Sequence, residues 1–440
     1  MLASLNDWNP WWSDRDAIRV LMGKEAEVLH ELVRFLEVRE IKVLTGVRRS
    51  GKSTLFYQLI DHLIKTGVPP ENILLINFDD DVLSKATLRE LFDTYQANIF
   101  CGKGTYFFID EAHRCREWAL FVRKLYETKQ VKQVFITDSS SSFIPKEYAQ
   151  VFTGRNVKYV HHPLSFRAYV EWNGAPKNPD IMSSFEENRL QGLLKDYMEY
   201  GGFPEVFFKE PSWKKIILKE YFDDILYKDI IDRFGIDLNK ARDFALFLMS
   251  NNTNPFSVRR YSREHGLSLQ SVEKYLALFE EVFLFFPVPR FDYSLRSQQL
   301  SQKKVYAIDH GLANVSGFRF SENKGKVAEN IVFIELMRRL SSLEKVFYWQ
   351  DPKRQHEIDF LVQQGLRPAE LIQVCWDPSE PSTRVRETEA LSLGLETFDL
   401  KEGVVITQKY EGEEAIDGRK IRYVPLWKWL LSTKQSASEE

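Results

Sequence analysis

The chain has 440 residues, too many for one ordinary domain, so about two to four domains are expected. Its composition, with 44% hydrophobic and 28% charged residues, is that of a soluble globular protein and excludes the disordered and fibrous classes. A net charge of −3 excludes a basic field over the whole surface, so any nucleic-acid surface has to be local.

The amino-terminal stretch MLASLNDWNPWWSDRD lacks the basic and then apolar pattern of a secretion signal, and no apolar run approaches the length of a membrane span. The cysteines have neither metal-ligand spacing nor the density of a disulfide framework, which suits a reducing compartment. They are Cys101, Cys115 and Cys375. We therefore predict a cytoplasmic protein with no membrane partner.

The stretch IKVLTGVRRSGKSTLF, residues 41–56, predicts a strand, a phosphate-binding loop and a helix. Its pattern, Gly46-x-x-x-x-Gly51-Lys52-Ser53, fits a Walker A motif, in which glycines and a helix N-terminus surround the phosphates of ATP. Lys52 is placed to reach the terminal phosphates, and the Ser53 hydroxyl to bind Mg²⁺. The alternative is a glycine-rich turn that matches by chance. The predicted nucleotide-binding residues of the loop are Gly46, Arg48, Arg49, Ser50, Gly51, Lys52, Ser53 and Thr54.

Further along the chain, TYFFIDEAHRC (105–115) is a buried-type strand that ends in two acidic residues. After a Walker A loop and an intervening strand–helix unit, it is typical of a Walker B segment. Asp110 would then hold Mg²⁺, and Glu111 would polarise the attacking water. Alone, the acidic pair would be interpreted as a cap of the next helix.

The next strand, KQVFITDSSSS (132–142), ends in polar groups where a sensor of the γ-phosphate would lie. Thr137 and Ser139 are the candidates, and an ordinary serine-rich loop is the alternative. Arg155 follows a short helical stretch and is placed to act as an arginine finger on a neighbouring copy. The alternative for Arg155 is an ordinary surface arginine.

Residues 166–240 are expected to be helical, with a break at EYGGFPEVF. Residues 241–312 contain three short helical patterns and then strands, the outline of a winged helix. Its basic residues predict contact with the DNA backbone, and a winged helix used only for protein contacts is the alternative. These residues are Arg259, Arg260, Arg263, Lys274, Arg290, Arg296, Lys303 and Lys304.

The last segment, residues 313–440, contains Glu329 on an amphipathic helix and Asp359 on a strand. Carboxylates from a helix and from neighbouring strands are how a hydrolytic Mg²⁺ site is assembled, and the element order resembles the PD-(D/E)xK nuclease fold. The motif of that fold has a carboxylate, one intervening residue and a lysine. This chain has Gln373-Val374-Cys375 at those positions. We therefore expect a remnant site of two carboxylates without a cation, and no nuclease activity.

Several stretches together resemble the prokaryotic AAA+ family ATPases of the archaeal-type, STAND-related branch that carry a C-terminal nuclease-like domain. They are GVRRSGKST, INFDD, FFIDEAHRCREW, ITDSSSS, TGRNVKYVHHPLSFRAYVEW, YMEYGGFPEVF and YFDDILYKDII. The resemblance covers residues from about 20 to about 430. It implies that 166–240 is the lid-like region after the ATPase core. The double arginine in the phosphate-binding loop is common in that family. Asp138 departs from the family's pattern, because the family usually has glycine at this position.

The predicted fold is α/β: a P-loop AAA+ core with a parallel sheet (1–165), a helical lid-like region (166–240), a winged helix (241–312) and a degenerate nuclease-like domain (313–440). The predicted activity is Mg²⁺-dependent ATP hydrolysis coupled to DNA remodelling or branched-DNA processing. The expected partners are DNA and a nuclease or other protein. The chain is also expected to form a homo-oligomer, for example a hexamer. The alternatives are a nucleotide-dependent interaction switch and an active ATP-dependent nuclease.

Overall fold

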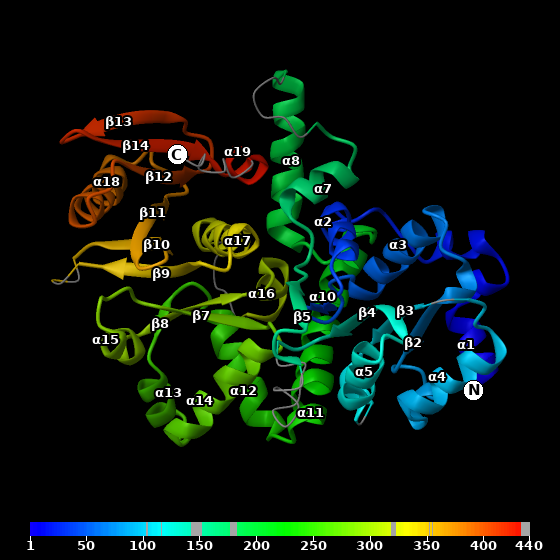
Figure 1. The fold of residues 1–440 in the computed structure, drawn as a ribbon. Coiled ribbons are helices and arrows are strands. Elements are labelled where there is room, and N and C mark those ends of the chain that lie inside the picture. Colours follow the sequence, from blue (N-terminus) through cyan, green and yellow to red (C-terminus); the bar gives the residue numbers. More distant parts are fainter. Residues whose placement is uncertain are drawn as a thin grey trace. The chain divides into compact units, whose positions relative to one another are not determined.

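The chain folds into two compact units (Figure 1). The structure is a computed structural model that describes residues 1–102, 104–115, 117–141, 152–176, 183–317, 323–351, 353 and 355–432. The first unit comprises Met1–Pro163 and Glu281–Phe283, and the second comprises Leu164–Glu280 and Leu284–Glu440.

The first unit is built on a five-stranded parallel sheet in the order β2-β3-β4-β1-β5. Strands β1, β2 and β3 are buried along their whole length, which is the burial pattern of a parallel sheet covered on both faces. The predicted α/β class with a parallel P-loop sheet is confirmed. The strands are β1 (Ile41–Thr45), β2 (Ile73–Asn77), β3 (Thr105–Asp110), β4 (Val131–Asp138) and β5 (Asn156–Val160).

Two hydrophobic cores, one on each face, follow from the alternation of side chains along these strands. On β3, Phe107 and Ile109 join the core under α1, α4 and α5, while Tyr106 and Phe108 join the core under α2 and α3 (Figure 1). The helices are α1 (Leu2–Trp8), α2 (Leu29–Arg34), α3 (Lys52–Lys65), α4 (Leu88–Asn98) and α5 (Trp118–Glu127). Short 3₁₀ turns lie at Pro10–Trp12, Arg15–Val20, Phe35–Glu37, Pro70–Asn72, Leu83–Lys85 and Ala112–Arg114.

The second unit begins with helices that surround a double-glycine joint. Gly201 has φ +76°, and a Cβ there would lie 2.1 Å from the carboxylate of Asp309. The carboxylate of Asp309 accepts a hydrogen bond from the N–H of Gly202 (2.7 Å). It also accepts from the N–H of Leu312 (3.0 Å) and so caps the helix that follows Asp309. The two glycines allow the backbone to come this close to the carboxylate. The helices are α7 (Phe166–Trp172), α8 (Ser184–Tyr200), α9 (Pro204–Phe207), α10 (Pro211–Asp224), a π-helix (Ile225–Ile231), α11 (Asp232–Phe234) and α16 (His310–Ser316).

The middle of the second unit combines helices with a small antiparallel sheet. The sheet has the order β6-β8-β7, with β6 between the first and second of three helices and one more helix between β7 and β8. The elements are α12 (Leu238–Ser250), β6 (Pro255–Phe256), α13 (Val258–Glu264), α14 (Leu269–Glu281), β7 (Phe285–Pro289), α15 (Leu295–Leu300) and β8 (Lys303–Ala307).

The end of the chain forms a mixed six-stranded sheet in the order β13-β14-β12-β11-β10-β9. The inner pairs β11–β12 and β12–β14 are parallel and the other pairs antiparallel, with α18 packed on the apolar face. The elements are α17 (Lys324–Arg339), β9 (Glu344–Gln350), β10 (Glu357–Gln364), β11 (Arg367–Val374), α18 (Pro381–Thr397), β12 (Glu402–Thr407), β13 (Gly412–Ile416), β14 (Arg419–Pro425) and α19 (Leu426–Leu431).

The substitution Asp309→Ala is predicted to lower the free energy of unfolding of the second unit by about 2–4 kcal/mol, because it leaves the N–H groups of Gly202 and Leu312 buried and unpaired. The matched control is Asp237→Ala, which removes an exposed cap of α12 and is expected to cost about 1 kcal/mol. Denaturant unfolding of both variants measures the difference. Equal losses would show that the contact with Gly202 contributes nothing.

Candidate functional site

The predicted phosphate-binding loop joins β1 to α3 and depends on glycine at two positions. A Cβ on Gly46 would lie 2.1 Å from the carbonyl oxygen of His161, so no larger residue fits. Gly51 has φ +104° immediately before α3 begins at Lys52. The helix therefore presents its free N–H groups and its positive end to the loop, an arrangement that binds anions.

The ammonium of Lys52 lies across this loop and is buried. It donates to the carbonyl oxygens of Gly46 (2.9 Å) and Val47 (3.0 Å). These partners carry no formal charge. A phosphate placed in the loop offers the ammonium a stronger, charge-assisted partner.

A chain of hydrogen bonds connects the loop to the ends of β3 and β4. Ser53 Oγ donates to Asp110 Oδ2 (2.7 Å), and Thr137 Oγ1 donates to Asp110 Oδ1. Thr137 Oγ1 also accepts from the N–H of Glu111 (3.0 Å). The hydroxyl of Ser53 and the carboxylate of Asp110 are hard oxygen ligands in contact with each other, so this pair fits Mg²⁺.

Glu111 follows directly and occupies a left-handed backbone conformation with φ +53°. Its Oε2 lies 3.4 Å from His113 Nδ1, and that nitrogen lies 3.5 Å from Asp138 Oδ2. Burial is the largest influence on the pKa of Glu111 and, with the charge of Asp110, raises it to about 7, while Lys52 and His113 act in the opposite direction. A carboxylate with this pKa can take a proton from water near neutral pH.

The two arginines of the loop lie in different surroundings. Arg48 is buried, and its guanidinium lies 3.9 Å from Asp79, which also pairs with Arg114 (2.8 Å). Arg49 is exposed and has φ +70°. Ser50 is buried and Thr54 is half-buried at the start of α3. Of the two loop arginines, the buried one therefore lies against an acidic partner.

The other two predicted catalytic residues lie in different places. Ser139 is buried just after β4, whose last residue, Asp138, pairs with Thr45 next to the loop, while Thr137 places its hydroxyl against Asp110 and the N–H of Glu111. Arg155 lies before β5, where its carbonyl accepts from Ile41 N, and its guanidinium is 3.5 Å from Glu127. It is therefore at the end of the sheet opposite the loop, about 16 Å along β1 from Gly46. From there it cannot act on the nucleotide of its own chain.

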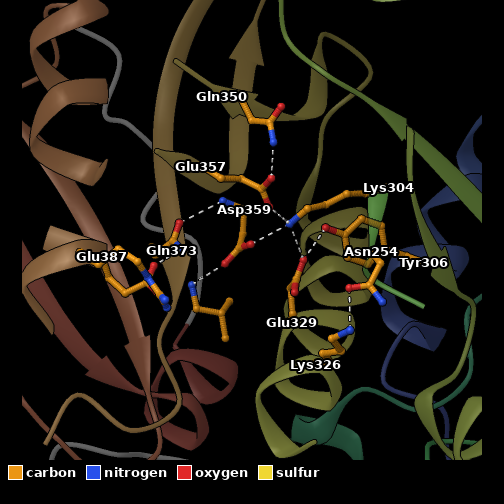
Figure 2. Close-up of polar contacts among 12 residues, drawn as sticks. Asn254, Lys304, Tyr306, Lys326, Glu329, Gln350, Glu357, Asp359, Gln373 and Glu387 are labelled. Atoms are coloured by element: carbon orange, nitrogen blue, oxygen red, sulfur yellow. Dashed lines mark hydrogen bonds and ion pairs between the residues drawn. The ribbon is translucent and has the colours of Figure 1, made fainter. Parts of the chain in front are cut away.

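The second predicted cluster, in the second unit, differs from the expectation (Figure 2). The ammonium of Lys304, on β8, donates hydrogen bonds to Glu329 and Asp359 and forms an ion pair with Glu357. It lies 2.9 Å from Glu329 Oε1, 2.8 Å from Glu357 Oε1 and 2.8 Å from Asp359 Oδ1. The expectation of two carboxylates without a cation is wrong, because a lysine from the wing strand enters the cluster. Lys304 is also buried, so the predicted contact of this residue with DNA is wrong.

The electrostatics of this cluster follow from burial. Burial, and then the charge of Asp359, raise the pKa of Glu329 to about 7. Burial alone would lower the pKa of Lys304, but Asp359 and Glu329 outweigh it and hold that pKa well above its ordinary value. Tyr306 Oη donates to Glu329 (2.8 Å), and Gln350 donates to Glu357 (2.7 Å).

Residues at the end of β11, where the nuclease pattern would have its carboxylate and lysine, contact the same cluster. Gln373 Oε1 accepts from the N–H of Asp359 (3.0 Å), and Val374 N donates to Asp359 Oδ2 (3.0 Å). Cys375 is buried, and burial raises the pKa of its thiol to about 11, which disfavours the thiolate form near neutral pH. Across the residues that the structure describes, no group of three or more His, Cys, Asp or Glu side chains is arranged to hold a metal ion.

Sequence reasoning missed three features of these sites: His113, Glu357 and the buried position of Lys304. Of these, only the burial of Lys304 had a signal in the sequence. Lys304 directly precedes the apolar run VYAI of a buried-type strand, a place where lysine is rare.

None of the helices in the described ranges has both the length and the apolar character that crossing a membrane requires.

Comparisons with known proteins divide the chain in three. An AAA domain matches residues 38–170. Two domains of unknown function follow, DUF8612 at residues 191–322 and DUF4143 at residues 324–429.

Two curated proteins are similar over nearly the whole chain. Uncharacterized protein MJ1544 of Methanocaldococcus jannaschii is 32% identical over 432 residues, which cover 93% of each chain. An uncharacterized protein of Haemophilus influenzae is 31% identical over 413 residues, which cover 91% of this chain and 96% of its own. Among solved structures, C. elegans PCH-2 is 14% identical with a TM-score of 0.31, covering 48% of this chain and 72% of its own. At that level we draw nothing about this chain from PCH-2.

The substitution Thr137→Val is predicted to lower kcat for ATP hydrolysis on the order of 10²-fold with little change in KM, because Asp110 and Glu111 both lose the hydroxyl that positions them. Steady-state kinetics check the prediction. The matched control is Thr137→Ser, which keeps the hydroxyl and is expected to retain most of the activity. An unchanged kcat in the valine variant would show that the hydroxyl does not position the carboxylates.

Proposed function

This chain belongs to the family of AAA-domain proteins that includes the M. jannaschii and H. influenzae relatives, and we propose that it hydrolyses ATP with Mg²⁺ and couples hydrolysis to DNA. The observation that carries the proposal is the hydrogen-bonded chain from Ser53 through Asp110 and Thr137 to Glu111. It brings two hydroxyls, two acidic residues and an anion-binding loop together at the carboxyl ends of neighbouring parallel strands.

Each residue then has a role that its contacts support. Lys52 releases the carbonyl oxygens of the loop and donates to the terminal phosphates of ATP. Ser53 and Asp110 hold Mg²⁺, which neutralises charge on the phosphates when it is bound. Glu111 orients the attacking water and takes its proton.

We further propose that the functional form is a homo-oligomer in which Arg155 acts on the nucleotide of a neighbouring copy. Its place at the far end of β1 excludes action within its own chain, and its side chain, beside Glu127, is partly exposed. A guanidinium there would stabilise the charge that develops on the transferred phosphoryl group.

The proposal predicts opposite binding behaviour for two variants of the site. Lys52→Ala should weaken ATP binding and lower turnover at least about 10²-fold, because the phosphates lose a buried cation. Glu111→Gln should keep ATP bound while lowering turnover about 10²–10⁴-fold, because only the base is lost. Fluorescent-nucleotide binding and phosphate release measure the two effects.

The matched control for Lys52 is Lys65→Ala, an exposed lysine in the last turn of the same helix, which should leave both properties unchanged. Loss of ATP binding in both Lys52→Ala and Glu111→Gln would contradict the role given to Glu111.

The proposal of a DNA surface rests on the winged helix. Its exposed basic side chains include Arg259 and Arg263 on α13, Lys274 on α14 and Arg296 on α15. Arg260, also exposed, pairs with Glu264 (2.8 Å). Basic residues on the helices and wing of this motif are suited to contact the phosphate backbone, independently of sequence.

DNA is predicted to stimulate ATP turnover, and the double substitution Arg263→Ala with Lys274→Ala should remove most of the stimulation without changing the basal rate. Turnover measured with single-stranded, duplex and branched DNA, over a range of salt concentrations, checks this. The control is Lys401→Ala, an exposed lysine before β12. Absence of stimulation by any DNA would favour the alternative, a nucleotide-dependent interaction switch.

A further inference from the structure

We propose that the ammonium of Lys304 is a built-in cation that takes the place of a divalent metal ion among Glu329, Glu357 and Asp359. In this role it excludes metal from the nuclease-like site and ties the wing strand β8 to the C-terminal domain. The proposal does not depend on ATP hydrolysis, because all these residues belong to the second unit.

Carboxylates surround the ammonium of Lys304 on three sides. All three lie at 2.8–2.9 Å from Nζ, and two of them, Glu329 and Asp359, accept hydrogen bonds from it (Figure 2). The side chain is 3% exposed. The lysine is therefore held by the carboxylates and not presented to a scissile phosphate or an attacking water, which a catalytic lysine would have to contact.

A metal ion and this ammonium exclude one another. Mg²⁺ lies about 2.0–2.1 Å from its oxygen ligands, so an ion bound to the same three carboxylates would lie in contact with Nζ. Two cations at contact in a buried site repel each other strongly. The residues present therefore do not fit the Mg²⁺ site that the nuclease-like element order implies.

The same strand is joined to α17 by further polar contacts. Tyr306, two residues after Lys304, donates to Glu329. The backbone N–H and C=O of Ala307 both pair with the side-chain amide of Asn330, each at 3.0 Å. The ion cluster is thus one part of a buried polar connection between the winged helix and the last domain.

The test compares metal binding with and without Lys304. Because the nucleotide site is expected to bind Mn²⁺ as well, every protein carries Asp110→Asn and is free of nucleotide. We expect Lys304→Ala to bind one Mn²⁺ by calorimetry, and its Tm to rise on the order of 3 °C at ten times the dissociation constant. Adding Asp359→Asn should abolish both effects.

The matched control is Lys303→Ala, whose side chain leaves the opposite face of β8 and which should bind no Mn²⁺ at this site. A folded Lys304→Ala protein without Mn²⁺ binding would overturn the proposal. If that variant does not fold, Mn²⁺ binding is measured on the protein with Lys304 intact, with and without Asp359→Asn. If Asp359→Asn removes no Mn²⁺ binding from it, the proposal is supported. If Asp359→Asn does remove Mn²⁺ binding, the metal occupies the cluster beside Lys304 and the proposal is overturned.

Discussion

A buried ammonium group needs acceptors close to its N–H groups, and this constraint shapes both sites of the protein. The two units supply different acceptors. Lys52 is held by the neutral carbonyl oxygens of Gly46 and Val47, whereas Lys304 is held by three carboxylates. The first arrangement gives way to a stronger anion, so it suits a lysine that receives phosphate. The second is already saturated with negative charge, so it suits a lysine that stays in place.

This difference assigns the chemistry to the first unit. There the loop, the acidic ends of neighbouring parallel strands and a base with a raised pKa form one connected set. In the second unit the carboxylates that the nuclease-like element order places together serve to bury a lysine. An active nuclease, one of the alternatives for this chain, would need a free cation and a metal ion where Lys304 now lies. The cluster thus connects the last sheet and α17 to β8.

The local features of the fold were predictable because they depend on neighbours in sequence. Apolar runs predicted the strands, and because parallel strands end at one edge of a sheet, Asp110 could be placed near Ser53. Those side chains are in contact, and their role as Mg²⁺ ligands stays a prediction. The Lys304 cluster could not be predicted, because Glu329 and Asp359 are 25 and 55 residues away in sequence, and only the packing of β8 against α17 and β10 brings them together. His113 was missed for a related reason, since a lone histidine gives no sequence signal.

The most direct measurement is an experimental structure of the Glu111→Gln protein with ATP and Mg²⁺, compared with the same protein free of nucleotide. We expect Lys52 to move from the carbonyl oxygens of Gly46 and Val47 to the terminal phosphates, with Mg²⁺ beside Ser53 and Asp110. Lys304 should keep its three carboxylates in both states. A nucleotide bound elsewhere, or a Lys52 that stays on the loop carbonyls while ATP is bound, would contradict the roles given to the two lysines and to the loop.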